Sequence, residues 1–215
     1  MIWMGYKEKR QLWKQYSKMA DLPIIARRKF FNNCFDGTLT SAGIISGFFI
    51  LFLINPSMAT TITILITGFA TALAIGVSGL WGAFLSEEAE RKKKINDLNK
   101  IMAIIEDENE KDTEKKKAPT TLQKAENFAT WVASLVDGGA PVIGAALPLI
   151  PFFFGTNLTI IHFVFSYVIL ICLLIYLGIF LGNISGGSKI KYIFHLILAG
   201  IVTLILSILL GSLTS

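Results

Sequence analysis

Charge is scarce in this sequence, and it is absent from long stretches where a soluble protein would carry it. No charged residue occurs from Gly37 to Ser86, and from Asn127 to Ser188 the only charged residue is Asp137. The chain is 53% hydrophobic and 16% charged, with a mean hydropathy of +0.60. This composition excludes an ordinary soluble domain and indicates that lipid is the solvent of most of the chain.

Other absences narrow the class further. The two cysteines, Cys34 and Cys172, exclude a disulfide framework. No glycine-rich phosphate loop with a lysine occurs, which argues against a nucleotide-driven pump. The first 36 residues lack a continuous apolar core, so we expect no cleavable signal peptide. His162 and His195 have no acidic or cysteine companion at ligand spacing and are interpreted as packed or interfacial.

What the sequence does contain is five apolar stretches long enough to cross a bilayer. A helix needs about 20 residues to span roughly 30 Å of hydrocarbon. We therefore predict an all-α membrane protein with five transmembrane helices, over residues 37–54, 59–85, 128–154, 159–181 and 190–213. Its segments are an interfacial amphipathic helix (1–35), spans 1 and 2 (36–85), a charged helical cytoplasmic insert (86–127) and spans 3 to 5 (128–215).

The basic residues favour one orientation. They gather in the first 36 residues, in the insert, and at Lys189 and Lys191, whereas the other connections hold none. The positive-inside rule then predicts a cytoplasmic N-terminus and a C-terminus outside or in a lumen. Aromatic residues at near-helical spacing within the first segment favour a helix on an anionic leaflet, with a solvated basic tail as the alternative. The net charge of +5 is explained by these flanks, so no nucleic-acid partner is implied.

Two Asp-Gly pairs mark the candidate site. Asp36-Gly37 opens the first span and Asp137-Gly138 lies in the third, each with a glycine seven residues after the aspartate. An ionised Asp at the bilayer centre costs roughly 2.5 to 3.5 kcal/mol and is kept where it meets water, a partner or an ion. Asp36 could also simply cap the first span, since Asp is a preferred N-cap residue.

Prolines follow the second pair and favour a kinked or broken helix with free carbonyl oxygens. Pro141 cannot donate a hydrogen bond to the carbonyl of Asp137, and Pro148 and Pro151 likewise cannot donate to the carbonyls of Gly144 and Leu147. Carboxylate and carbonyl oxygens together suit a hard or borderline divalent cation. Small residues in spans 1 and 2 predict close helix packing, either within the bundle or across a homodimer.

The insert carries acidic residues that share helix faces. Glu87 with Glu90, and Asp107 with Glu110, are three residues apart, and Glu106 adjoins the second pair. They are candidate metal ligands if the helices converge. The alternative is an ordinary solvated helix with mixed charges.

Several segments are similar to the vacuolar iron transporter family. They are Phe35-Asp36-Gly37-Thr38, Ser78 to Gly82 with Leu85-Ser86 and Glu90, and Gly144 to Pro151. The resemblance implies a homodimer with an ion path at its two-fold interface, exchange of Fe²⁺ or similar ions for protons, and a cytoplasmic glutamate cluster. The chain departs from the family where Gly79 replaces a methionine of the second span, and where the insert is shorter. We hypothesise that Asp137 supplies the missing ligand within the membrane.

The predicted function is therefore secondary transport of a divalent metal, Fe²⁺ with Mn²⁺ or Zn²⁺ as alternatives, out of the cytoplasm in exchange for protons. The transport residues would be Asp36, Gly37, Asp137 and Gly138, with metal as substrate and no organic cofactor. The alternatives are a metal-binding or scaffolding membrane protein that does not transport, and a membrane-embedded lipid-modifying enzyme. The enzyme fits less well, because residues 38–54 lack the further aspartates and the arginine that such enzymes need.

Overall fold

The described part of the chain is entirely helical. The computed structural model describes residues 6–19, 21–106, 121–155 and 157–214. In chain order the elements are α1 (Tyr6–Met19), α2 (Leu22–Ile54), η1 (Pro56–Met58), α3 (Thr61–Glu106), α4 (Thr121–Ala146), η2 (Leu147–Phe153), α5 (Ile160–Ser185) and α6 (Lys189–Thr214). Five helices are long and apolar enough to cross a membrane, which confirms the predicted number of spans.

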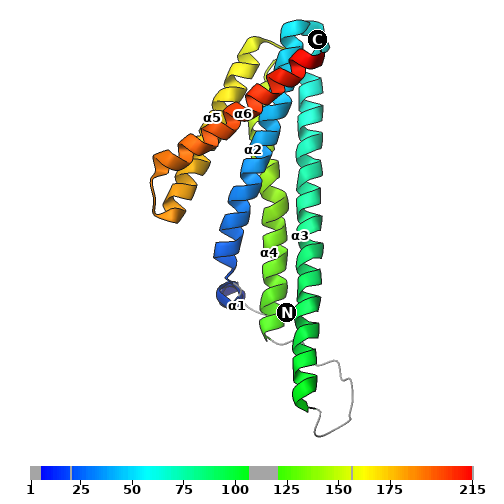
Figure 1. Ribbon diagram of the computed structural model, residues 1–215, viewed down its shortest axis with the longest axis vertical. Helices are drawn as coiled ribbons and strands as arrows, with labels where there is room; N and C mark the ends of the chain where they lie inside the picture. Colours follow the sequence, from blue (N-terminus) through cyan, green and yellow to red (C-terminus); the bar gives the residue numbers. More distant parts are fainter. Residues whose placement is uncertain (1–5, 20, 107–120, 156, 215) are drawn as a thin grey trace.

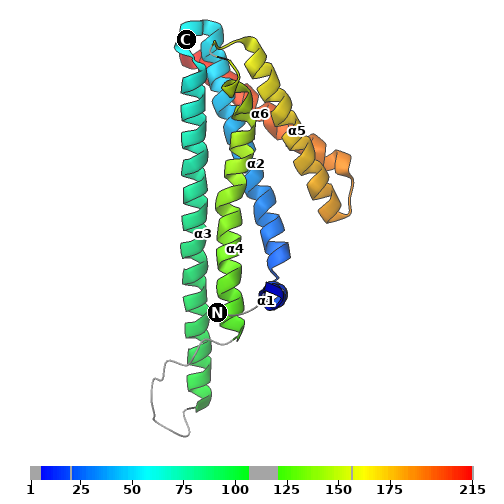
Figure 2. The ribbon, with the colours of Figure 1, turned by 180° about the vertical axis from the view of Figure 1, so that it is seen from behind.

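The helices form two groups (Figures 1 and 2). α2, α3 and α4 stand side by side as an upright bundle, with α2 and α4 running in one direction and α3 in the other. α5 and α6 form a hairpin that leans against α2, and α1 lies across the lower end of the bundle. The α5–α6 turn, which carries Lys189, points towards the end where α1 lies. The described basic residues therefore lie towards one end of the bundle, and the orientation in the membrane stays a prediction.

The first span begins earlier than the sequence indicates. α2 begins at Leu22 rather than at Gly37, after Asp21 in the left-handed conformation and with Pro23 in its first turn, where a proline is tolerated. The interpretation of Asp36 as a helix N-cap is wrong, because Asp36 lies well inside α2. Residues 22–35 belong to this helix, and the separate amphipathic helix α1 ends at Met19.

α1 is held to the bundle by aromatic side chains. The rings of Trp13 and Tyr16 lie with their centroids 5.5 and 6.3 Å from that of Phe128, near the start of α4. Trp13 still leaves 59% of its surface exposed. An exposed tryptophan at the end of a spanning bundle suits the membrane–water interface.

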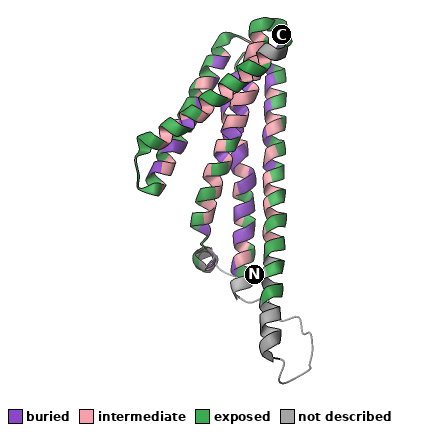
Figure 3. Ribbon diagram, viewed as in Figure 1, coloured by how far each residue is buried: buried purple, intermediate pink, exposed green. Residues whose placement is uncertain are grey.

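α4 is the most enclosed of the long helices (Figure 3). In the most apolar stretch of this helix 56% of the residues are buried, whereas in the corresponding stretch of α6 only 6% are. The α-helix continues through Pro141 and changes to a 3₁₀ helix only at Leu147, beside Pro148. The predicted irregularity of the third span is therefore present, but it comes after Pro141. The Pro148 carbonyl accepts a hydrogen bond of 2.6 Å from the Ser166 hydroxyl of α5.

Candidate ion-binding site

Asp137 is a buried carboxylate with a donor on each oxygen. It retains only 9% of its surface and projects from α4 towards α2. Its Oδ2 accepts from the Lys29 ammonium at 2.5 Å, and its Oδ1 accepts from the Asn33 amide at 2.7 Å. Lys29 and Asn33 are four residues apart on α2 and therefore share one helix face. The Asn33 amide also donates to the Lys29 carbonyl at 2.9 Å, which holds the amide in place.

A second carboxylate approaches the same ammonium from α3. Glu87 Oε1 lies 3.5 Å from Lys29 Nζ, so Lys29 stands between two acids. The three side chains differ in exposure: 12% for Asp137, 20% for Lys29 and 35% for Glu87. The cluster thus grades from a buried carboxylate to a half-exposed one, and its formal charge is −1.

These side chains line a polar pocket of about 390 Å³ where α2, α3 and α4 meet. Its walls are Lys29, Asn33, Ser78, Gly79, Gly82, Ala83, Ser86, Glu87 and Asp137. Carboxylate, amide and hydroxyl oxygens are the ligand types that hard divalent cations take. The described residues nevertheless contain no group of three or more His, Cys, Asp or Glu side chains close enough to hold a metal. The pocket therefore has two acids and an internal cation rather than a complete cage of acids.

Glycines bring α3 and α4 close enough to form this pocket. A Cβ added at Gly79 would lie 2.6 Å from the Asp137 carbonyl oxygen, and one at Gly138 would lie 2.6 Å from the Gly76 carbonyl oxygen. Both approaches are to backbone, so neither can be relieved by turning a side chain. The absence of a methionine at position 79 thus has a physical reason: α4 occupies the space that its side chain would need. The small residues of the second span serve packing within the chain, which resolves one of the two alternatives for that stripe.

The depth of the pocket follows from the helix register. Gly79, which faces Asp137, lies six residues before Leu85, the last residue of the predicted second span. At 1.5 Å per residue this is about 9 Å inside the boundary. Trp81 and Trp131, which are 64% and 56% exposed, surround this level, and the Trp131 ring lies 4.8 Å from that of Phe84. Exposed tryptophans are typical of the interfacial belt. Measured from the predicted end of the second span, Asp137 therefore lies inside the hydrocarbon, close to its boundary.

Asp36 lies on a different surface. It is exposed and is not part of the Asp137 pocket. Its neighbour Gly37 packs against the backbone of Pro141, one turn beyond Asp137, so Asp36 lies deeper in the membrane than Asp137. Along α2 its stripe continues at helical spacing through Thr40, Gly43 and Gly47.

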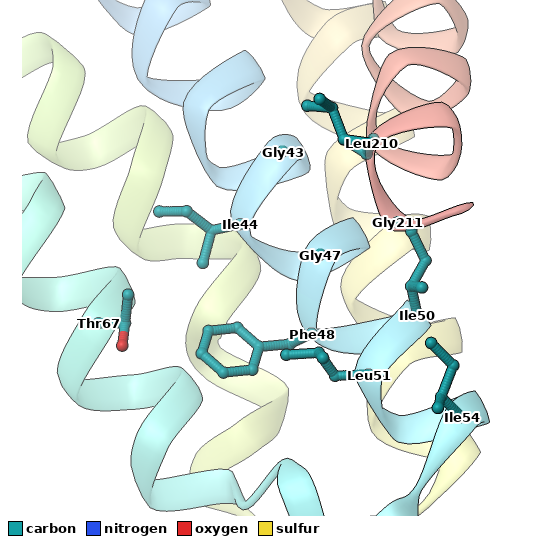
Figure 4. Close-up of a pocket in the computed structure, with 11 residues that line it drawn as sticks. Gly43, Ile44, Gly47, Phe48, Ile50, Leu51, Ile54, Thr67, Leu210 and Gly211 are labelled. Atoms are coloured by element: carbon teal, nitrogen blue, oxygen red, sulfur yellow. The ribbon is translucent and has the colours of Figure 1, made fainter. Parts of the chain in front are cut away.

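This stripe ends in an open groove (Figure 4). The groove has a volume of about 450 Å³ and lies between α2, Thr67 of α3 and the end of α6 near Gly211. A Cβ added at Gly47 would meet no atom within 4 Å, so this glycine is not used for packing within the chain. The small-residue stripe of the first span therefore remains available to a partner.

The predicted insert residues are only partly described. Glu87 joins the pocket, Glu90 is exposed, and Glu106 is the last residue of α3. Asp107 and Glu110 lie outside the described residues. The two histidines bond nearby backbone and capping groups: His162 pairs with Thr159 at the start of α5, and His195 Nδ1 lies 2.6 Å from the Lys191 carbonyl oxygen.

Lys29 and Asn33 were missed by sequence reasoning. Both lie in the segment assigned to an interfacial helix, so their charge and polarity were attributed to the membrane surface. The sequence did contain a sign of their position. If the first span is continued backwards as one helix, residues 29, 33 and 37 lie on one face at successive turns. Gly37 already indicated that this face meets another backbone.

Fold and site together define a multi-pass helical membrane protein with a charged pocket just inside one boundary of its bundle. The model of the VIT family matches residues 111–212. The match confirms the resemblance to the vacuolar iron transporter family over this part of the chain, which contains Asp137 but not Asp36. An uncharacterized protein of Methanocaldococcus jannaschii is 28% identical over 159 residues, which cover 72% of each chain. This similarity supports membrane transport of metal ions, and a transporter rather than an enzyme.

Proposed function

We propose that this protein is a homodimeric secondary transporter that moves Fe²⁺ or Mn²⁺ out of the cytoplasm in exchange for protons. The observation that carries the proposal is Asp137, a carboxylate kept within the membrane, in a polar pocket on the helix with the most protein around it. An acid at this depth is costly unless it serves a partner or an ion. The family resemblance favours the ion.

Asp36 supports both a continued path and a second copy of the chain. It lies beyond Asn33 on α2, one turn further into the membrane, and it faces out of the monomer. Facing lipid, an ionised Asp would cost about 2.5 to 3.5 kcal/mol. Two copies meeting along the Asp36, Thr40, Gly43 and Gly47 stripe would cover it with protein and bring two carboxylates together. We propose this stripe as the homodimer interface and the ion path.

Direction and coupling rest on orientation and on ligand chemistry. The basic residues lie towards the end of the bundle that holds the Asp137 pocket, and the positive-inside rule assigns that end to the cytoplasm. The pocket would then collect its cation from the cytoplasm. A carboxylate that binds a cation gives up its proton, so a proton gradient of the opposite sense can drive release.

The ligand set favours metals that accept oxygen ligands. Asp36, Asp137 and Glu87 offer carboxylates, and Ser78 and Ser86 offer hydroxyls, but the pocket contains no thioether or thiolate. Oxygen ligands suit Mn²⁺ well and Fe²⁺ adequately, whereas they give no particular preference for Zn²⁺. The ligand set therefore predicts transport of Mn²⁺ as well as of Fe²⁺.

The test is ion flux in liposomes that contain the purified protein. An outward or inward pH gradient should drive Fe²⁺ and Mn²⁺ movement, measured with an enclosed metal-sensitive dye, and pH should change in step. Asp36→Asn and Asp137→Asn should each abolish this flux, whereas Glu88→Gln, on an exposed surface of α3, should leave it unchanged. Full flux in the Asp137→Asn vesicles would refute the role of the pocket.

One observation favours a second candidate. Lys29 already occupies the buried carboxylate, as expected of a membrane protein that binds metal weakly or keeps only the fold. Such a protein would show no pH-driven flux in any vesicle. Saturable Mn²⁺ binding without flux would support this second function.

A further inference from the structure

Lys29 holds the position that a cation bound to Asp137 would take. Its ammonium lies 2.5 Å from Asp137 Oδ2 and 3.5 Å from Glu87 Oε1, between the two acids of the pocket. The remaining oxygen of Asp137 already accepts from Asn33. A metal ion therefore cannot join the pair of acids while the ammonium stays between them.

The geometry also gives the ammonium somewhere to go. The Lys29 backbone is part of α2, but its ammonium is carried on a flexible four-carbon stem that can rotate. Glu87 is the more exposed of the two acids, at 35% against 12% for Asp137. A small rotation about the stem would move the charge away from Asp137, past Glu87 and towards water.

Resting on the transport function proposed above, we propose that Lys29 is a tethered competing cation. A divalent ion binds between Asp137 and Glu87 by displacing the ammonium past Glu87 into water. Lys29 would thus make the site select divalent over monovalent cations. A monovalent ion offers a single positive charge, which the ammonium already supplies. Only an ion of higher charge neutralises both carboxylates and gains from the exchange.

Charge counting gives the direction of selectivity. With Lys29 in place the cluster of two acids and one ammonium carries −1. Sodium in place of the ammonium leaves the same −1, and nothing is gained to offset the displacement. A divalent ion in its place brings the two acids to zero. Lys29 should thus lower the affinity for every cation but exclude monovalent ions more completely.

The first experiment measures Mn²⁺ affinity by calorimetry on the purified full-length protein. If the ammonium leaves Asp137 free for a tenth of the time or less, its removal should tighten binding about tenfold or more, because apparent affinity scales with the competent fraction. Lys29→Gln should show this gain, whereas Lys29→Arg, which keeps a tethered cation, should not. Lys92→Gln is the matched control, because it removes the same charge from an exposed site. Lys92 pairs with Glu88 at 2.8 Å on the exposed face of α3.

Monovalent competition gives a second readout. In the wild type, sodium chloride and choline chloride at equal ionic strength should weaken Mn²⁺ binding equally, by screening alone. In Lys29→Gln, sodium should compete more than choline. Equal effects of the two salts in the variant, or Mn²⁺ affinity unchanged or weaker in Lys29→Gln, would overturn the proposal.

A third measurement needs no substitution and covers the case in which Lys29→Gln does not fold. Amine-reactive labelling of the wild type, read by mass spectrometry, should rise at Lys29 when Mn²⁺ saturates the protein, while labelling of Lys92 stays constant. Saturable binding that depends on Asp137 but leaves Lys29 labelling unchanged would overturn the competing-cation role alone. Absence of Mn²⁺ binding to the wild type and to every Lys29 variant would instead reject the proposed transport function.

Discussion

The two Asp-Gly pairs have the same sequence spacing but different surroundings. In both, the glycine lies at a helix contact: Gly37 meets the backbone of Pro141, and Gly138 meets Gly76 and Leu80. The aspartates differ, because Asp137 is 9% exposed and bonded to Lys29 and Asn33, whereas Asp36 faces outward. A repeated motif thus preserves how helices pack, while the charge beside it can serve two different purposes.

Burial of α4 explains why the two acids differ. α4 is enclosed by α2, α3, α1 and η2, so a polar group on it can find a protein partner. α2 has one face on α4 and another open along the Asp36 stripe. The α5–α6 hairpin is the opposite extreme: it contains no acidic residue, and only 6% of the residues in the most apolar stretch of α6 are buried. Within the spans, the one buried carboxylate among the described residues, Asp137, lies where protein surrounds it, and the proposed dimer would do the same for Asp36.

The largest effects should come from the two glycines, whose roles are alike. Gly37→Ala and Gly138→Ala each place a methyl group against backbone of the neighbouring helix, so the helices must separate. We expect each to lower the free energy of unfolding by about 3 kcal/mol, at the upper end of the overpacking range. Denaturant unfolding in detergent micelles measures this loss.

Two further glycines supply matched controls for that experiment. An added Cβ at Gly47 on α2, or at Gly139 on α4, meets no atom within 4 Å. In the monomer, at low protein concentration, alanine there should be neutral or should stabilise by up to about 1 kcal/mol through helix propensity. Equal destabilisation by all four substitutions would show that the close helix contacts are not what these glycines provide.

Substitution of the two aspartates should change stability by different amounts, whereas substitution of the two glycines should change it by similar amounts. Asp137→Asn leaves the Lys29 ammonium with only the more distant and more exposed Glu87 as a charged partner, and breaking a buried pair costs about 3 to 5 kcal/mol. Because Lys29 is 20% and Asp137 12% exposed, we expect a smaller loss of about 2 kcal/mol. Asp36→Asn should leave the stability of the monomer unchanged within about 0.5 kcal/mol, since exposed substitutions rarely exceed this. Thermal unfolding at low protein concentration would measure both, and equal losses would remove the distinction between the two pairs.

A double substitution tests why the buried pair exists. Lys29→Met with Asp137→Leu replaces both charges by apolar groups, which is often neutral or stabilising where one partner alone is not. We expect stability within about 1 kcal/mol of the wild type, together with loss of Mn²⁺ binding and flux. Stability well below that of Asp137→Asn alone would mean that the pair is kept for folding rather than for ions.

Much of this arrangement could be predicted from the sequence, and the missing part has a clear cause. Hydropathy identified five spans because the bilayer sets their length. The two aspartates were recognised because the sequence around them has almost no charged residues. Lys29 and Asn33 were not recognised because polarity alone cannot tell a membrane surface from a pocket inside a bundle. That distinction depends on which helix lies opposite, and the register of α2 against α4 is set by the contacts of Gly37 and Gly144. The outward direction of Asp36 likewise depends on that register.

A small effect is also expected at a serine beside each pair. Ser41 lies one turn after Gly37, Ser134 lies one turn before Asp137, and both are 1% exposed. Their hydroxyls are buried without a hydrogen-bond partner among the described residues. Removing an unsatisfied buried hydroxyl is close to neutral or slightly favourable, so Ser41→Ala and Ser134→Ala should change the free energy of unfolding by no more than about 1 kcal/mol.

A loss of about 2 kcal/mol at Ser134 alone, with normal behaviour at Ser41, would indicate that its hydroxyl binds a water or an ion next to Asp137. The polar site would then extend one turn along α4 towards the charged end, and the contrast between the two pairs would include their serines.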